Sequence, residues 1–152
     1  MALTMPFTVW VYDVDVIHQV DGDTFDIQYY EKPGELVTER LRLLIADTPE
    51  LHGDTKVQGQ AAQAWSAIWL AQRRGHEPFP FRAMLTTRDT LSRRLGYLWS
   101  RSDGACLNED LLAAHMADIW TRGHGKKRRV FPTGEITPSP PATVPPKETP
   151  TT

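Results

Sequence analysis

The first half of the chain alternates apolar and polar residues in short runs that end at turns containing glycine or proline. This alternation restricts the fold more than any other feature, because it is typical of β-strands that bury one face. It predicts strands over residues 7–20, 24–29 and 37–46, with turns at 21–23 and 32–34. The chain is therefore expected to begin with a three-stranded antiparallel unit.

The second half of the chain combines helical and strand periods. The spacing of its apolar residues predicts a helix over 57–74, with Trp65 and Trp69 facing the core and Gly75 as the C-cap. Asn108 is expected to cap a second helix or tie it to the strands. The remaining elements are expected as strands at 79–87 and 94–100 and a helix at 107–119.

Three strands, a helix, two strands and a helix suit one small barrel. We expect an α+β fold that is mainly β, with five antiparallel strands closed into an OB-fold barrel and two to three packed helices. The regular pattern stops near Gly123. The prediction is one domain over residues 1–125, followed by a basic and then Pro/Thr-rich disordered tail over 126–152.

Charge and composition exclude several classes of protein. The net charge is -2, and it divides into +3 on residues 126–152 and -5 on the rest, so any contact with nucleic acid must come from local arginines or a bound cation. The single cysteine, Cys106, excludes an internal disulfide. Neither a signal peptide nor a membrane span is evident. We expect a monomer without membrane association, either cytoplasmic or encoded by a phage or mobile element.

Two acidic clusters lie where predicted strands end. The first is Asp21-Gly22-Asp23-Thr24 and the second is Asp47-Thr48-Pro49-Glu50. Short carboxylates and a carbonyl at a strand end are the oxygen ligands that a hard cation prefers. Each cluster alone has an ordinary explanation, because the first is a common turn and the second resembles a helix N-cap followed by proline.

Arginines near these clusters favour the chemical explanation. Arg40 and Arg42 share one side of the third predicted strand, and Arg88, Arg93 and Arg94 flank the loop between the fourth and fifth. Guanidinium groups bind phosphate in a bidentate manner. Carboxylates for a cation and for water, with arginines for the phosphate, form the combination that phosphodiester cleavage requires.

Four blocks together resemble one family. They are I-x-Q-V-D-G-D-T-F-D-I, R-L-R-L-L-I-A-D-T-P-E, D-T-L-S-R-R-L-G-Y-L and L-N-E-D-L-L-A-A-H-M-A, in this order between residues 14 and 120. This series resembles the staphylococcal (micrococcal, thermonuclease-type) nuclease family. The resemblance implies an OB-fold barrel and a calcium-dependent (Ca²⁺) nuclease that acts on DNA and RNA.

The resemblance also assigns roles by motif position. Asp23 and Asp47 would bind Ca²⁺ through carboxylates and Thr48 through its carbonyl, while Asp21 would support these ligands without direct contact. Glu50 would be the general base that activates water.

Two arginines complete the site that the family implies. Arg42 and Arg93 would hold the phosphate and stabilise the added charge of the transition state. Cleavage on the 5′-oxygen side would leave 3′-phosphate ends.

The chain departs from the family where the substrate is held. Ser92 replaces the usual glycine before the second arginine, and Thr90-Leu91 replaces a Lys-Tyr pair, so we expect weaker or altered substrate binding. Lys56 is a candidate basic contact with the substrate. Trp120 is the nearest aromatic where the family has tyrosines, and is a candidate for base stacking or for the core.

Two alternatives stay open. Degenerate copies of this fold serve as non-catalytic modules that bind nucleic acid or protein, although here none of the acidic and arginine positions is lost. The proline-rich residues 138–146 could instead dock a partner and make the chain an adaptor.

Overall fold

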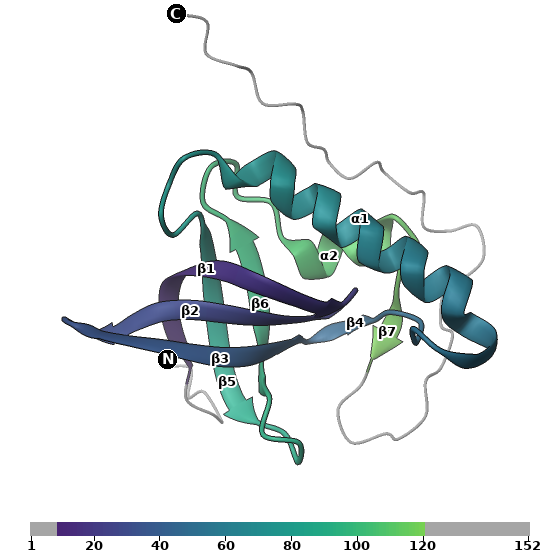
Figure 1. The fold of residues 1–152 in the computed structure, drawn as a ribbon, viewed down its shortest axis with the longest axis horizontal. Coiled ribbons are helices and arrows are strands. Elements are labelled where there is room, and N and C mark those ends of the chain that lie inside the picture. Colours follow the sequence, from purple (N-terminus) through teal and green to yellow (C-terminus); the bar gives the residue numbers. More distant parts are fainter. Residues whose placement is uncertain (1–8, 121–152) are drawn as a thin grey trace, which may run out of the picture.

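A computed structural model describes residues 9–120 of the chain (Figure 1). The expected tail at 126–152, and the end of the expected domain at 121–125, lie outside these residues. The elements are β1 (Trp10–Asp21), β2 (Thr24–Lys32), β3 (Glu35–Leu43), β4 (Ile45–Asp47), the 3-10 helix η1 (Gly53–Thr55), α1 (Lys56–Arg74), β5 (Phe81–Arg88), β6 (Arg94–Ser100), α2 (Leu107–Ala113) and β7 (Asp118–Trp120).

Five of these strands close into a barrel in the order β1-β2-β3-β6-β5. This architecture confirms the predicted α+β, mainly β, OB-like fold. The prediction that all five strands are antiparallel is wrong, because β3 and β6 pair in parallel, with Leu41 opposite Arg94 and Leu43 opposite Gly96. An odd number of strands cannot alternate in direction all the way around a closed barrel, so one neighbouring pair must be parallel.

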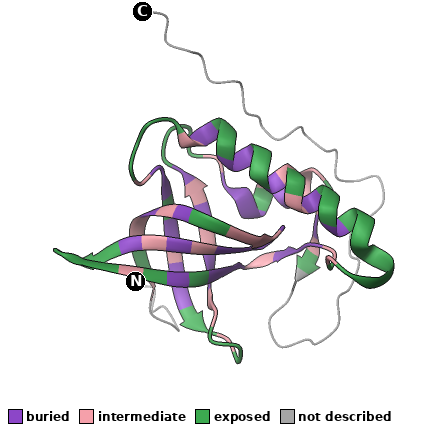
Figure 2. Ribbon diagram, in the orientation of Figure 1, coloured by how far each residue is buried: buried purple, intermediate pink, exposed green. Residues whose placement is uncertain are grey.

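The hydrophobic core fills the barrel and extends to the helices that pack beside it (Figure 2). In α1 the buried residues recur every three to four positions, as expected for a helix with one face on a core. Trp69 is fully buried in the core, and Trp65 packs against it from a half-buried position. Gly75 ends α1 with a φ of 58°, as its predicted C-cap role requires.

The strand predicted over 37–46 is two strands. β3 ends at Leu43, and the chain turns before β4 begins at Ile45, which has a φ of 61°. β4 then leaves the barrel and pairs with β7 in a separate two-stranded sheet. The apolar run through this segment continues without a break, so its periodicity did not reveal the corner.

The helix predicted over 107–119 is also wrong at its C-terminal end. α2 stops at Ala113, and His115 follows in the left-handed conformation with a φ of 61°. The Met116 amide donates to the Leu111 carbonyl at 2.9 Å and the His115 amide donates to the Leu112 carbonyl at 3.0 Å, which is the Schellman pattern of helix termination. The chain then continues into β7.

Among the helices of residues 9–120, none combines the length and the apolar character that a membrane crossing needs.

Candidate functional site

The turn between β1 and β2 meets the end of β3. Thr24 is the register partner of Arg42, and the Leu43 amide donates to the Asp23 carbonyl at 2.9 Å. Within the turn, the Asp23 amide donates to Asp21 Oδ1 at 3.1 Å. These contacts place the first acidic cluster beside the corner that leads into β4 and the second cluster.

Asp23 lies where the β1–β2 turn meets the end of β3. Its side chain is almost fully buried and accepts from Thr24 Oγ1 at 2.8 Å. Its other oxygen, Oδ2, accepts from the Thr48 amide at 2.7 Å and from Thr48 Oγ1 at 2.9 Å. Two motifs that are 25 residues apart in sequence are therefore joined directly. A carboxylate has about four acceptor sites, so these three hydrogen bonds do not saturate it.

Arg42 closes the corner between β3 and β4. Its Nη1 donates to the carbonyls of Leu43 and Ala46, both at 2.7 Å, and its Nη2 donates to Asp47 Oδ1 at 2.8 Å. Nη1 also lies 3.5 Å from Asp23 Oδ2. Arg42 as a whole residue is 5% exposed. Arg42 thus holds the two aspartates around one buried positive charge, in addition to any contact with a substrate.

The acidic turn is also held from the side of α1. Ser66 Oγ donates to the Gly22 carbonyl at 2.9 Å, and Gln19 Nε2 donates to the Gln63 carbonyl at 3.0 Å. A Cβ atom on Gly22 would lie 2.8 Å from Thr48 Cγ2, so a side chain there would push the two motifs apart. Sequence reasoning missed these supporting residues, although a serine on the apolar face of a predicted helix is a usable signal of such a contact.

The charges of the cluster do not balance. Burial, and next the neighbouring charge of Asp23, raise the pKa of Asp21 to about 6. Asp23 and Asp47 lie around the guanidinium of Arg42, and Asp21 lies beside Asp23, so these three carboxylates outnumber the Arg42 guanidinium when all are ionised. A divalent cation with oxygen ligands would neutralise this excess, so the donor set fits Ca²⁺ in charge and in chemistry.

The set of residues that could ligate the cation is nevertheless small. Within residues 9–120, no group of three His, Cys, Asp or Glu side chains lies close enough to hold a metal ion. The expected ligands, Asp23, Asp47 and the Thr48 carbonyl, contain only two carboxylates. Bound water and phosphate oxygens would have to complete the coordination of a cation at this position.

Glu50 lies just beyond the buried cluster. Pro49 separates it from Thr48, and its side chain is exposed, with His52 Nε2 3.8 Å from Glu50 Oε1. The backbone that carries Glu50 packs closely against α1, since a Cβ atom on Gly59 would lie 2.3 Å from the Glu50 carbonyl oxygen. Glu50 is therefore a solvent-facing carboxylate on a segment whose backbone is held in place.

Arg93 is held in the loop between β5 and β6 and makes its ion pair there. Its Nε donates to Asp89 Oδ2 at 2.8 Å, and its amide donates to Asp89 Oδ1 at 2.9 Å. Burial acts to raise the pKa of Asp89, but the hydrogen bonds from Arg93 and Leu91 outweigh it and the pKa is lowered. Leu95 is the partner of Arg42 in the β3–β6 pair and Arg94 is the partner of Leu41, so Arg93 directly precedes the first residue of this pair.

The other expected substrate contacts lie outside the cluster. Lys56 is exposed at the start of α1. The backbone of Trp120 pairs with Ile45 in the β4–β7 ladder, and the Trp120 side chain lies outside the part of the chain that the structure describes. Arg40 turns to Asp26 on the barrel surface, with Nε donating to Oδ1 at 2.8 Å.

Comparison with known proteins adds no assignment. No family model matches the chain, and no curated protein matches it.

Proposed function

We propose that this chain is a Ca²⁺-dependent nuclease that hydrolyses phosphodiester bonds of DNA and/or RNA. One observation carries the proposal: Asp23, Asp47 and Arg42 converge at a buried corner directly before an exposed Glu50. The four ordered motifs that resemble thermonuclease-type nucleases support the same assignment.

The buried part of the site would bind the cation and the phosphate. Asp23 and Asp47 would hold Ca²⁺ with the Thr48 carbonyl, and Asp21 would add negative charge from the turn. A bound Ca²⁺ supplies a Lewis acid for the phosphate oxygens. Arg42 donates N–H groups from a desolvated position, where a charged hydrogen bond to a phosphate is stronger than in water.

The exposed part of the site would activate the attacking water molecule. The Glu50 carboxylate faces solvent and can accept a proton from a water molecule that attacks phosphorus. Arg93 would stabilise charge on the phosphate from the β5–β6 loop, with its guanidinium oriented by Asp89. The expected products carry 3′-phosphate ends.

Digestion by the full chain tests the proposal. Single-stranded DNA, double-stranded DNA and RNA are each incubated with Ca²⁺ or with chelator, and products are resolved by length and by end group. We expect cleavage with Ca²⁺ and none with chelator. A folded chain that cleaves none of the three under either condition contradicts the nuclease proposal, and binding without cleavage would favour a non-catalytic nucleic-acid module.

A single substitution tests the role of Glu50. Glu50→Gln keeps the shape of the side chain but removes its ability to accept a proton, so we expect the rate to fall about 10²–10⁴-fold. Glu31→Gln is the matched control, because Glu31 is an exposed carboxylate at the far end of β2. Equal rates for Glu50→Gln and the unmodified chain would remove Glu50 from the role of general base.

A further inference from the structure

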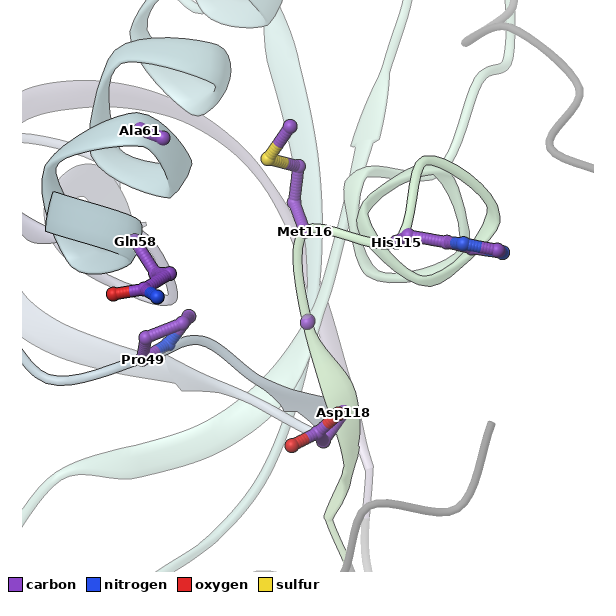
Figure 3. A pocket seen from close by; sticks show the side chains of 7 residues that line it. Pro49, Gln58, Ala61, His115, Met116 and Asp118 are labelled. Atoms are coloured by element: carbon purple, nitrogen blue, oxygen red, sulfur yellow. The ribbon is translucent and has the colours of Figure 1, made fainter. Parts of the chain in front are cut away.

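A cavity of about 460 Å³ opens beside the proposed cleavage site (Figure 3). It lies between the start of α1, the end of β4 and the segment that joins α2 to β7. Its volume falls within the range of roughly 300–1,000 Å³ that is usual for pockets that bind small ligands. The lining residues are Pro49, Gln58, Ala61, His115, Met116, Ala117 and Asp118.

The walls of the cavity combine four apolar residues with three polar ones, Gln58, His115 and Asp118. Met116 lies opposite Gln58 across the opening, and the Asp118 carboxylate points toward the side formed by Pro49 and Gln58 (Figure 3). The imidazole of His115 points away from the cavity in the same view. Neither lysine nor arginine occurs among the described residues that line it, so its chemistry does not suit a phosphate.

The cavity borders the segments that carry the acidic cluster. Pro49 lies between Thr48 and Glu50 in the chain, and Asp118 is the register partner of Asp47 in the β4–β7 ladder. Gly59, the neighbour of Gln58 in α1, packs against the Glu50 carbonyl. A nucleotide whose phosphate lay at the cluster would therefore have this cavity within reach of its base.

We propose that the cavity is a nucleobase subsite that selects bases with an exocyclic amino group. This inference rests on the proposed nuclease function, because that function brings a nucleotide to the neighbouring cluster. Pro49 and Met116 offer apolar surface to the faces of a base, and the Gln58 amide can both donate and accept at its edge.

Asp118 provides the selectivity. An ionised carboxylate only accepts hydrogen bonds, so it pairs with the 4-amino group of cytosine and repels the 4-oxo group of uracil. Its roughly four acceptor sites allow a base to bind alongside its other contacts. A good pairing of this kind changes affinity by about tenfold or more between bases.

Cytidine and uridine provide a matched pair of probes, because they share the sugar and the pyrimidine ring and differ in the 4-amino or 4-oxo group and in the hydrogen that uridine carries on N3. Each nucleoside is titrated into the full chain labelled with ¹³C at its methionine methyl groups, and methyl shifts are followed by NMR. We expect the Met116 signal to move with saturation, and cytidine to bind about tenfold more tightly than uridine. The Met84 signal in β5 is the internal control and should not move.

The variant Asp118→Asn tests the selecting group. Its side-chain amide can donate to uracil as well as accept from cytosine, so the ratio of the two affinities should fall to about one. Equal binding of the two nucleosides by the unmodified chain, or shifts that spare Met116, would overturn the inference without any variant. A tenfold preference that survives in Asp118→Asn would also overturn it.

The nucleosides contain no phosphate, so this test is separate from cleavage. A chain that cleaves nucleic acid but binds cytidine and uridine equally contradicts the base subsite alone. A chain that prefers cytidine at Met116 but cleaves nothing contradicts the nuclease proposal alone.

Discussion

Ser92 adopts a conformation that its side chain disfavours. Its φ is 64°, in the left-handed region, where a Cβ atom crowds the following carbonyl. The position is nevertheless tightly defined, because the Ser92 amide donates to the Asp89 carbonyl at 3.0 Å and the Asp89 amide donates to the Arg93 carbonyl at 2.8 Å. The loop that presents Arg93 thus keeps a glycine-like turn with a serine in it.

We predict that Ser92→Gly stabilises the protein by about 0.5–1 kcal/mol. Glycine removes the strain of the left-handed conformation, which is roughly 1–2 kcal/mol. Part of this gain in stability is lost, because glycine also increases the conformational entropy of the unfolded chain. The free energy of unfolding in urea measures the effect. Ser92→Ala is the control, because it keeps the Cβ atom and should give no gain; an equal gain from alanine would show that strain is not the cause.

At the scale of elements, α1 packs directly against the backbone of the segment that carries Glu50. The Cβ position of Gly59 lies 2.3 Å from the Glu50 carbonyl oxygen and 2.9 Å from that of Pro49. At this distance between the two backbones, α1 has no space for a side chain at position 59. The tightness of this packing ties the position of Glu50 to the position of α1.

Gly59→Ala should therefore destabilise the fold, by about 1–3 kcal/mol, as expected for overpacking. An ordinary glycine in a helix interior would instead gain about 1 kcal/mol on replacement by alanine, so the sign itself is diagnostic. Thermal unfolding measures the stability, and the cleavage rate reports on Glu50. A stabilised Gly59→Ala variant would contradict the close contact.

A single buried amide ties α2 to β6 and to the corner between β3 and β4. Asn108 Nδ2 donates to the Leu44 carbonyl at 2.8 Å and to the Gly96 carbonyl at 3.1 Å, and its Oδ1 accepts from the Leu98 amide at 3.0 Å. Of the two roles expected for Asn108, the structure shows the tie, since the N-cap residue is Cys106. The tie holds the corner where the chain leaves the barrel.

Replacing Asn108 with alanine would remove the partner of the Leu44 carbonyl and of the Leu98 amide, whereas the Gly96 carbonyl would keep its bond from the Leu44 amide at 2.8 Å. We predict that Asn108→Ala costs about 2 kcal/mol or more of stability, because each buried polar group without a hydrogen bond costs about 1–3 kcal/mol. Urea unfolding measures the loss. Glu109→Ala, one residue along on the exposed side of α2, should change stability by less than about 0.5 kcal/mol. Similar losses in the two variants would refute the tie.

For the whole molecule, the acidic cluster joins the barrel to the β4–β7 sheet. The β1–β2 turn belongs to the barrel, and Asp47 belongs to the β4–β7 sheet. Arg42 bridges them from the end of β3. A cation bound between Asp23 and Asp47 would strengthen this junction in the folded state alone.

Ca²⁺ should accordingly raise the melting temperature. A ligand specific for the folded state stabilises it by about 2.7 kcal/mol at a hundred times its dissociation constant. Calorimetry with Ca²⁺ and with chelator measures the shift. We expect Asp23→Asn and Asp47→Asn to lose it and Asp54→Asn, an exposed carboxylate near α1, to keep it. A shift that is unchanged in the first two variants would place calcium elsewhere.

Much of the barrel follows from local sequence signals. The alternation around Val14 and Phe25, the turn at Gly22 and the helical face of Trp69 each depend on neighbours within a few residues. These signals predicted the five strands of the barrel and α1. They failed where distant contacts decide the backbone, at the corner before Ile45 and at the end of α2 at Ala113.

The sequence by itself determined which residues are candidates for the proposed chemistry, because short motifs hold Asp23, Asp47, Glu50 and Arg42 in fixed order. Only the tertiary structure decided how they meet. Asp23 and Thr48 are joined because strand pairing brings the first turn to the end of β3, and such pairing depends on contacts between distant residues. The same folding placed Asp118 opposite Asp47 and opened the cavity beside Glu50, neither of which any local pattern encodes.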